Sequence, residues 1–457
     1  MPVEAKNLVL EELLELLLHG NKSEIRDFLN DQYSQDLAET IETLNDADKL
    51  SCFLLLDLEH TSDVLAELSS ETQNYLLQVL GSKKLAPIIS QMDSDDAADL
   101  INELDTEDKT NLLEILPDPI HQAHVQELIN YPAKSAGGIM STDFLRLRSD
   151  MTIQIALNYV RRHAAQEQTQ IYYLYVVDNT NKLVGVISLR NLIIASLSDI
   201  VANHMSTEIL TCNVDDDQET VAHTIAKYDL IAVPIIDKEN KLKGIVTVDD
   251  VVDILKEETT EDIYQSSGIT QETEPDKLIS GQINYALKAR FPWLLLTLVG
   301  EVIAVFIISY HEKSIISAPI AISFMPLLSG LSGNVGGQTS TIVVRGLVTG
   351  DIDLKNTFKY ILRELKIGFL LGLICSFITG AFAWMQYGTA FLGIVVAFSL
   401  TVTMSFGVLL GTAFPILLQY LKKDPAAASS PFITTILDIF TFSFYLTMVS
   451  LTLKHIN

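Results

Sequence analysis

Apolar residues, most of them leucines, recur three and four positions apart from the N-terminus to about residue 130, which is the spacing of one face of an α-helix. Short polar breaks interrupt this pattern, and they read LNDAD, LSSET, MDSDD and LDTED. Each break places Asp or Ser where a helix N-cap belongs, followed by acids in the first turn, where the helix dipole favours negative charge. The pattern predicts an all-α domain, residues 1–130, built as a stack of short helical hairpins.

From about residue 137 the pattern changes to short apolar strands, and the stretch up to residue 256 contains an internal duplication. IYYLYVVD at 171–178, followed by NKLVGVISL, matches LIAVPIID at 230–237, followed by NKLKGIVTV, at a lag of 59 residues. The segments 139–142 and 204–207 also resemble each other. Each unit predicts a strand, a turn at Asn-Lys and a second strand that leads into a helix. We therefore expect two related α/β units, residues 131–200 and 201–256.

Five apolar runs after residue 290 are long enough to cross a bilayer, which takes about 20 helical residues. They are Trp293–Tyr310, Ala318–Ile342, Ile367–Gln386, Thr389–Tyr420 and Pro431–Leu453. Basic residues gather on one side of these runs, namely Lys288, Arg290, Lys355, Lys359, Arg363, Lys366, Lys422 and Lys423, whereas Lys313 and Lys454 fall on the other. The positive-inside rule then predicts a multi-pass protein of the cell membrane with a cytosolic N-terminus and an external C-terminus. We expect a connecting helix at 257–290 and a transmembrane domain at 291–457.

Charge is distributed very unevenly along the chain. Only 9 of the 31 basic and 7 of the 58 acidic residues follow position 290, so the front part carries about 29 surplus negative charges. Such a field attracts cations and disfavours nucleic acid as a partner. The three cysteines lack the spacing of a zinc site or a disulfide framework. No pairing of a nucleophile with a base stands out, so we do not expect an enzyme.

One acidic residue, Asp438, lies inside the last apolar run. A carboxylate at membrane depth costs several kcal/mol unless it faces a pore or a polar partner, so it commonly marks an ion pathway. Asp438 is therefore a candidate pore carboxylate, and the alternative is a structural aspartate bonded to a neighbouring helix. A second acid, Glu301, lies in the first run. The sequence leaves open whether Glu301 faces the pore, pairs with a polar group or reaches the outer boundary.

The second run contains the glycine-rich segment GLSGNVGGQ at residues 330–338. It lacks the Lys of a phosphate-binding loop, so it gives little support to a nucleotide-hydrolysing function. Small residues either permit close helix packing or form a bent helix whose carbonyls line a pore, and the two interpretations are compatible. The candidate pore-lining residues are Asn334, Gly336 and Gln338, with Asp424 at the cytosolic mouth. Asp424 lies beside Pro425, where it could equally be a helix cap.

The segment VDDVVDILKEETTEDIY, which leaves the second repeat unit, places four acids on one helix face, at steps of three, four and four: Asp250, Asp253, Glu257 and Glu261. Glu258 and Asp262 lie beside this face. Like charges at such spacing repel by a few tenths of a kcal/mol per pair. A solvated helix face is the simple explanation, and a cation-binding face is the functional one.

Three groups of residues carry a family resemblance. SGNVGGQ at 332–338 followed by VVRGL, Asp424-Pro425 through PFITT at 431–435 with Asp438 beyond it, and YPAKSAGGIM at 131–140 resemble the MgtE magnesium channels. The duplicated region resembles a tandem pair of CBS domains, and the order of domains is also similar to that of the family. The resemblance covers essentially the whole chain. It implies a homodimer in the lipid bilayer whose pore carboxylate selects Mg²⁺ and whose cytosolic domains bind Mg²⁺ and close the pore.

The resemblance also implies which residues bind the ion. Asp438 matches the pore carboxylate, and the matching regulatory positions are Asp217, Glu219, the Ala226 backbone and Asp229 in the second CBS unit, Asp250, Asp253, Glu258, Glu261 and Asp262 after it, and Asp63, Asp95 and Asp99 in the helical domain. Around the last group, Asp93 and Asp96 already account for an ordinary helix start. ATP at the CBS pair is a further ligand that the resemblance allows.

We therefore expect a Mg²⁺-selective channel for magnesium uptake that intracellular Mg²⁺ closes. The alternatives are a CBS-regulated secondary carrier for another divalent cation or solute, and a nucleotide-sensing membrane scaffold without transport. A carrier is expected to show inverted repeats with paired broken helices, and the sequence shows no such repeat.

Overall fold

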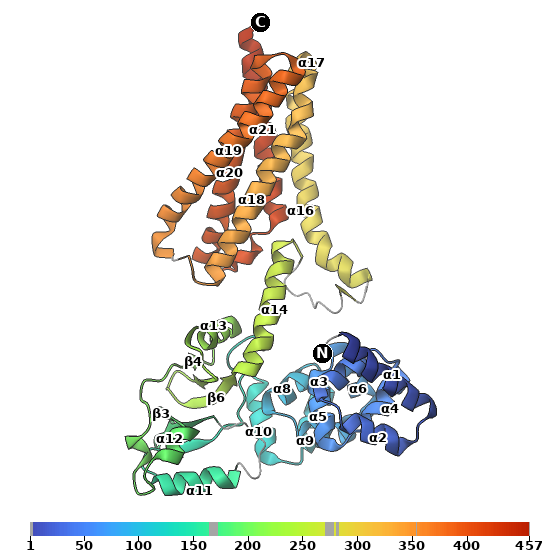
Figure 1. Ribbon diagram of the computed structural model, residues 1–457, viewed down its shortest axis with the longest axis vertical. Coiled ribbons are helices and arrows are strands. Elements are labelled where there is room, and N and C mark those ends of the chain that lie inside the picture. Colours follow the sequence, from blue (N-terminus) through green and yellow to red (C-terminus); the bar gives the residue numbers. More distant parts are fainter. Residues whose placement is uncertain (1–2, 164–171, 270–277, 280–282, 353, 457) are drawn as a thin grey trace. The chain divides into compact units, whose positions relative to one another are not determined.

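The computed structural model describes residues 3–163, 172–269, 278–279, 283–352 and 354–456, and within them the chain forms two compact units, residues 1–256 and 257–457 (Figure 1). The first unit contains a helical domain and two small mixed sheets. The second contains five long apolar helices. The predicted fold class is therefore confirmed: an all-α domain, a pair of α/β units and a five-helix membrane domain.

The helical domain consists of ten short helices with apolar faces packed into one core. Their bounds are α1 Val3–His19, α2 Lys22–Asn30, α3 Ser34–Glu42, α4 Asp46–Phe53, α5 Leu58–Glu67, α6 Ser70–Leu80, α7 Ser82–Ile89, α8 Ser94–Asn102, α9 Thr106–Ile115 and α10 Pro119–Leu128. Three of the four polar breaks supply the expected N-cap. Asn45, Ser69 and Asp105 accept hydrogen bonds from first-turn backbone N–H groups at 3.1, 3.4 and 3.0 Å.

The fourth break, MDSDD, starts helix α8 as expected, with Asp96 in its first turn, but the cap contact differs. Asp93 stands at the N-cap position of α8 but accepts no capping bond through its side chain. The Ser94 N–H donates instead to Asp143 at 3.1 Å, and the buried Ser94 hydroxyl lies 2.8 Å from that of Thr142. These bonds attach the start of α8 to the segment that enters the CBS pair, and they leave the carboxylate of Asp93 available for another role.

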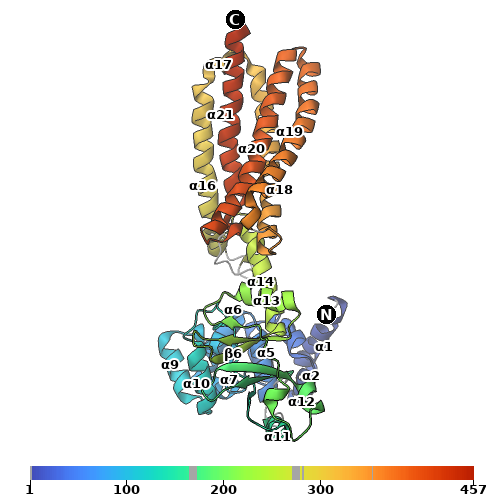
Figure 2. The same ribbon diagram turned by 90° about the vertical axis from the view of Figure 1, so that its left-hand side faces the viewer.

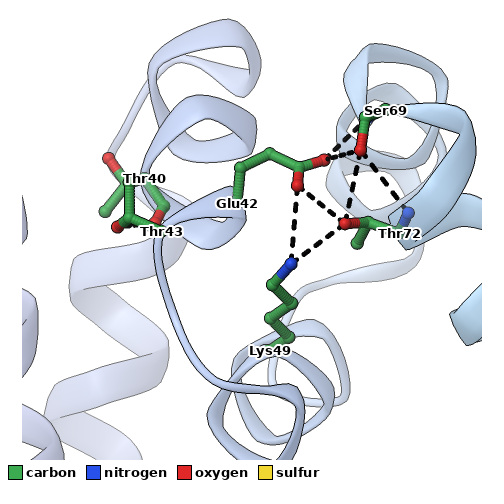
Figure 3. A network of polar contacts seen from close by, with 6 residues as sticks. All are labelled: Thr40, Glu42, Thr43, Lys49, Ser69 and Thr72. Carbon is green, nitrogen blue, oxygen red and sulfur yellow. Dashed lines mark hydrogen bonds and ion pairs between the residues drawn. The ribbon is translucent and has the colours of Figure 1, made fainter. Parts of the chain in front are cut away.

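A polar network joins α3, α4 and α6 (Figure 3). Glu42, the last residue of α3, accepts hydrogen bonds from the Ser69 N–H at 2.8 Å, the Ser69 hydroxyl at 2.7 Å and the Thr72 hydroxyl at 2.7 Å. Lys49 lies 3.4 Å from the same carboxylate. Burial alone would raise the pKa of Glu42, but the bonds from Thr72 and Ser69 and the charge of Lys49 lower it on balance.

The two α/β units repeat each other element by element. The strands are β1 Arg146–Arg148, β2 Tyr173–Val177 and β3 Leu183–Ser188 in one sheet, and β4 Cys212–Asn213, β5 Ala232–Ile236 and β6 Leu242–Thr247 in the other. Both sheets follow chain order, with the first pair parallel and the second antiparallel. The helices are α11 Ile153–His163, α12 Leu189–Ile194, α13 Gln218–Tyr228 and α14 Val248–Ser266. Asn181 and Asn240 adopt positive φ values of 63° and 62° at the predicted Asn-Lys turns.

Each α/β unit contributes a methionine that packs against a strand glycine of the other unit. A Cβ atom on Gly185 would lie 2.3 Å from the Met205 sulfur, and one on Gly244 would lie 2.6 Å from Met140. Isolated bridges join Ser141 to Ile245 and Val186 to Ser206 in the same crossed manner. The duplication seen in the sequence is thus a reciprocal packing arrangement.

The five long helices of the second unit lie side by side in both views (Figures 1 and 2). They are α16 Ile283–Tyr310, α18 Met325–Val348 preceded by the 3₁₀ turn Pro319–Phe324, α19 Thr357–Tyr387, α20 Ala390–Tyr420 and α21 Ser430–Ile456. The short helix α17, Glu312–Ser317, follows α16, and the 3₁₀ turns Leu354–Asn356 and Pro425–Ala427 precede α19 and α21. All five are long and apolar enough to cross a membrane.

Several helices extend beyond the apolar runs that predict them. Helix α19 begins at Thr357 and carries Lys359, Arg363 and Lys366 in its first three turns, so helical structure continues where hydrophobicity ends. Residues 283–290, expected in the connecting helix, belong to α16, and α14 ends at Ser266 before Gly268 at a φ of 81°. The rest of the expected connecting segment, 270–277 and 280–282, lies outside the described residues.

Candidate functional site

Helices α18 and α21 run antiparallel and meet in steps of four residues. A Cβ atom on Gly337 would lie 3.1 Å from the Ser430 hydroxyl, and one on Gly333 would lie 3.2 Å from the Thr434 methyl group. One turn further along both helices, the Ser329 hydroxyl donates to Asp438. The glycines let the two helices approach closely, and this register sets Asp438 opposite Ser329.

Asp438 therefore has a polar partner on a neighbouring helix, which is part of what the structural alternative requires. Its side chain is nevertheless only half-buried in the protomer. A half-exposed carboxylate in the middle of a span is not satisfied by one hydroxyl, because a carboxylate accepts about four hydrogen bonds. The arrangement orients Asp438 and leaves it able to bind a cation.

A polar stripe follows the face of α18 next to Ser329. Gly330, Asn334, Gln338 and Thr341, three or four residues apart, are all exposed in the protomer. Exposed amides are costly against lipid, so such a face requires water, protein or a second chain beside it. Asn334 and Gln338, two of the expected pore-lining residues, lie on this stripe.

Gly336, the third expected pore-lining residue, is buried. A Cβ atom there would lie 2.6 Å from Leu437, and one on Gly411 of α20 would lie 2.3 Å from the Gly336 carbonyl oxygen. The α-helix is continuous through residues 330–338. These contacts match the packing interpretation of the glycine cluster, and a pore-lining role for Gly336 stays a prediction.

A second acidic group lies within the same unit, where α14 ends and α21 begins. Incomplete hydration and the charges of Asp424 and Glu258 raise the pKa of Asp262 to about 6, and Arg345 acts in the opposite direction. Asp424 also caps the turn Pro425–Ala427, accepting from the Ala426 N–H at 2.8 Å. Asp424 thus has the cap role left open by the sequence and also contributes negative charge beside Asp262.

The third acidic group lies in the first unit, where the start of α8 faces the start of α14. Loss of water and the charges of Asp143, Asp250, Asp63 and Asp249 raise the pKa of Asp93. Burial and the charges of Asp96, Asp250 and Asp93 raise the pKa of Asp95 well above its usual range. One carboxylate oxygen of Asp95 is buried without a hydrogen-bond partner.

Asp96 and Asp250 show the same direction of shift. Loss of water and the charges of Asp93, Asp250 and Asp99 raise the pKa of Asp96 to about 7. Loss of water also raises the pKa of Asp250, although Thr247 donates to its carboxylate at 2.6 Å and opposes the shift. Carboxylates that raise one another's pKa favour either protons or a cation between them. We name this group, Asp63, Asp93, Asp95, Asp96, Asp99, Asp143, Asp249 and Asp250, the α8–α14 acidic cluster.

The acids of the second CBS unit are separated in the protomer. Asp217 caps the start of α13, accepting from the Glu219 N–H at 2.9 Å, and Asp229 ends it in the left-handed conformation at a φ of 51°. An 11-residue helix is about 16 Å long, so one ion cannot contact both ends. Ala226 is exposed near the second end.

The acidic residues on the exposed face of α14 do not form a single site. Asp253 lies 3.9 Å from Lys256, with both side chains largely exposed. Glu258 and Glu261 both raise the pKa of Asp262, which places all three near the C-terminal half of the helix. Among the described residues, no three His, Cys, Asp or Glu side chains come close enough together to hold a metal ion directly.

Sequence reasoning missed five members of these groups: Ser329, Asp93, Asp96, Asp143 and Asp249. Ser329 stands one position before the glycine cluster, and the i, i+4 series 329, 333 and 337 was the available signal. Asp93 and Asp96 were assigned to helix initiation. Asp143 lies 49 residues from the helix that it caps, so no local pattern could identify it.

Five membrane-length helices with a carboxylate at mid-span, joined to a CBS pair and an acidic helical domain, define a multi-pass ion transporter with additional non-membrane domains. Family models agree with this class. The MgtE divalent cation transporter model matches residues 325–448, the MgtE intracellular N domain matches 32–134, and the CBS domain matches 136–198 and 197–257.

Relatives match over nearly the full length. The chain is 35% identical to the magnesium transporter MgtE of Thermus thermophilus over 447 residues, which is 97% of this chain and 98% of the relative. It is 34% identical to the MgtE of Bacillus subtilis over 446 residues, covering 96% and 97%. The chain belongs to the MgtE family of magnesium transporters. It is thus a transporter and not an enzyme, with an intracellular N-terminal domain.

Two solved structures resemble the soluble part. The cytosolic domain of a Mg²⁺ channel MgtE in complex with ATP is 35% identical, covers 54% of this chain and 99% of that chain, and superimposes with a TM-score of 0.51. The soluble part of a magnesium transporter is 32% identical, covers 55% and 99%, and gives a TM-score of 0.50.

Proposed function

We propose that the chain forms a homodimeric, Mg²⁺-selective channel whose conduction path follows the polar stripe of α18 and passes Asp438. The observation that carries this proposal is the exposure of Asn334 and Gln338 on a membrane-spanning helix beside the carboxylate held by Ser329. A second copy facing the first would cover this stripe and enclose a polar path. Two Asp438 carboxylates would then face one ion.

The chemistry of Mg²⁺ suits such a site. Mg²⁺ dehydrates reluctantly and keeps several waters, so it is held through few direct ligands. One carboxylate from each copy, together with amides of the stripe, can accept hydrogen bonds from the water shell. A membrane potential of 100 mV contributes about 4.6 kcal/mol to the inward movement of a divalent ion, so no coupled gradient is required.

The two cytosolic acidic groups are the proposed sensor. Without Mg²⁺, the carboxylates of the α8–α14 acidic cluster repel one another, as do Asp262 and Asp424. Divalent ions remove that repulsion and stabilise the compact, closed form. A change from 99% open to 99% closed requires about 5.5 kcal/mol of differential binding, which several weakly bound ions can supply together.

Ions at the second CBS unit would lie between two copies of the chain. Asp217 and Glu219 lie at one end of α13, whereas Ala226 and Asp229 lie at the other, so a site containing both ends needs a second copy. With an intracellular N-terminal domain and five spans, the C-terminus lies outside.

ATP is a second proposed ligand of the CBS pair, because a relative's cytosolic domain was solved with ATP. Equilibrium dialysis of the full-length protein with ATP, with and without Mg²⁺, tests this point. Failure to retain ATP at millimolar concentration would reject it without affecting the channel proposal.

Mg²⁺ flux through purified protein in liposomes, measured against internal Mg²⁺ with no other ion gradient, tests the main proposal. We expect flux at low internal Mg²⁺, closure at millimolar concentrations, and loss of flux in Asp438→Asn. Transport that requires a proton or sodium gradient would favour the secondary carrier instead. Normal flux in a folded Asp438→Asn variant would reject the pore assignment.

A further inference from the structure

Glu301 is a membrane-depth carboxylate that the proposed conduction path does not yet include. It lies 18 residues after the start of α16 and 9 before its end, and its side chain is exposed in the protomer. A charged side chain so far from both ends of a span is costly against lipid and is usually retained for an ion pathway or a partner.

Close packing of α16 against α21 sets the position of this residue. A Cβ atom on Gly300 would lie 1.9 Å from the Thr435 methyl group and 3.9 Å from Ile439. Only glycine permits this approach, and it brings the next residue, Glu301, against the turn of α21 that carries Asp438. The carboxyl groups of Glu301 and Asp438 are near enough to influence each other electrostatically. Asp438 therefore lies between Ser329 of α18 on one side and Glu301 of α16 on the other.

No basic residue of these three helices reaches the pair, as far as the described residues extend. Arg290 precedes Glu301 by 11 positions, Arg345 follows Ser329 by 16, and Lys454 follows Asp438 by 16, which is about 16–24 Å along the helix axes. Two neighbouring carboxylates without a basic residue nearby favour a positive charge between them, either a shared proton or a cation. In a magnesium transporter, the transported divalent cation supplies that charge.

We infer that Glu301 is a second ion-binding carboxylate of the pore and that it sets the preference for divalent over monovalent cations. This inference rests on the proposed role of Asp438 in the conduction path. In a homodimer the site would present four carboxylates in place of two. Additional negative charge favours Mg²⁺ over Na⁺, because the electrostatic attraction scales with the charge of the ion.

Block of Na⁺ current by Mg²⁺ in planar bilayers, with the full-length protein and divalent-free solutions as the starting point, tests this inference. We expect Glu301→Gln to raise the half-blocking Mg²⁺ concentration at least about tenfold and Glu301→Asp to raise it about threefold, since the aspartate keeps the charge but moves it away. Glu312→Gln, which changes an exposed glutamate of α17, is the control and should leave block unchanged.

The outcomes separate this inference from the proposed pore. A wild-type half-blocking concentration in Glu301→Gln, together with a large increase in Asp438→Asn, would overturn the role of Glu301 and leave the pore assignment standing. Wild-type block in both variants would reject the pore itself. If Glu301→Gln fails to yield monodisperse protein, Glu301→Asp decides, and unchanged block in that variant overturns the inference.

Discussion

At the scale of single residues, the pore candidate depends on a hydroxyl that orients a carboxylate. Ser329 donates to Asp438 from a different helix, in the register that Gly333 and Gly337 permit. A carboxylate oriented in advance loses less side-chain entropy when it meets a hydrated ion. If Asp438 binds the ion as proposed, we expect the Ser329 hydroxyl to raise ion affinity without contacting the ion itself.

Ser329→Ala tests this contribution. We expect the Mg²⁺ concentration for half-maximal flux to rise about two- to tenfold, because a hydrogen bond of this kind contributes about 0.5–1.5 kcal/mol. Ser329→Thr retains the hydroxyl and should restore most of the affinity. The matched control is Ser450→Ala. It removes a hydroxyl of α21, the helix that carries Asp438, and this hydroxyl lies 2.7 Å from the Ser314 hydroxyl of α17. Equal effects of the two alanine variants would contradict a specific role for Ser329.

Single residues also show which parts of the candidate site could be predicted from the sequence. Asp438 could be identified because a lone acid in an apolar run is unusual and stands beside a specific motif. Ser329 and Asp143 could not, because their partners lie 109 and 49 residues away and only the folded chain brings them together. Glu301 remained ambiguous for the same reason: its contact with Asp438 depends on the packing of Gly300 against Thr435.

At the scale of helices, the helical domain is held by bonds between successive hairpins as well as by its apolar core. Glu42 ends α3 and satisfies the start of α6 by accepting from both the backbone and the hydroxyl of Ser69. Its pKa is lowered in the folded state. The stabilisation is therefore fully present above the ordinary glutamate pKa of about 4.3 and is lost as the pH falls through the folded value.

Glu42→Ala should lower the free energy of unfolding of the helical domain by about 1.5–3 kcal/mol at pH 7, because it removes charge-assisted hydrogen bonds. The loss should shrink as the pH falls below about 4. Urea unfolding followed by circular dichroism, at pH 7 and pH 3, measures both effects. Asp36→Ala, which removes an acid of the same helix outside this network, controls for the change of residue type. A pH-independent difference would show that the charge of Glu42 is not involved.

Small residues carry the packing of the membrane helices. Gly411 of α20 approaches the backbone of Gly336 in α18, where a Cβ atom would lie 2.3 Å from a carbonyl oxygen. Gly330, on the exposed stripe, has no atom within 4 Å of its Cβ position.

Gly411→Ala should therefore separate α18 from α20 and lower the melting temperature of the detergent-solubilised protein by several degrees, whereas Gly330→Ala should not. Differential scanning fluorimetry of both variants measures the difference. Equal melting temperatures would argue that α18 and α20 pack less closely than the contacts indicate.

The sequence predicted that these helices exist, but it predicted the residues at which they begin and end less accurately. The apolar runs located all five spans, because a bilayer-length hydrophobic stretch has few alternatives. The ends of α16 and α19 lie beyond those runs, since amphipathic turns with basic residues continue a helix into the interface. The MDSDD break located α8, but its cap proved to be distant.

At the scale of the whole molecule, surplus negative charge is organised into separate groups. The α8–α14 acidic cluster couples two domains that are far apart in the sequence, and four of its acids, Asp93, Asp95, Asp96 and Asp250, have raised pKa values. An acid with a raised folded pKa binds a proton that the unfolded chain has already released. Stability without metal therefore falls as the pH rises from about 4 through about 7.

Metal-free protein should accordingly melt at a higher temperature at pH 6 than at pH 8, and saturating Mg²⁺ should reduce this difference. Asp96→Asn should stabilise the metal-free protein at pH 8 and weaken its stabilisation by Mg²⁺. Asp31→Asn, which changes an exposed acid outside the cluster, should do neither. A Mg²⁺-dependent stabilisation that is unaltered in Asp96→Asn would remove this cluster from the sensor.

Composition predicted the uneven distribution of charge along the chain, but it did not predict which acidic residues lie together in the folded protein. Asp63, Asp95, Asp99 and Asp250 came from the family resemblance, and the structure adds Asp93, Asp96, Asp143 and Asp249 around them. Helix spacing alone could not select them, because acids at the start of a helix are commonplace and their meaning depends on what faces them.

The crossed contacts of Gly185 with Met205 and of Gly244 with Met140 have a consequence for folding. The packing of each half of the duplicated region includes a methionine from the other half. Removing one half would therefore leave a cavity in the other. The pair should melt in a single cooperative transition, and a disturbance in one half should be transmitted to the other as a loss of shared packing.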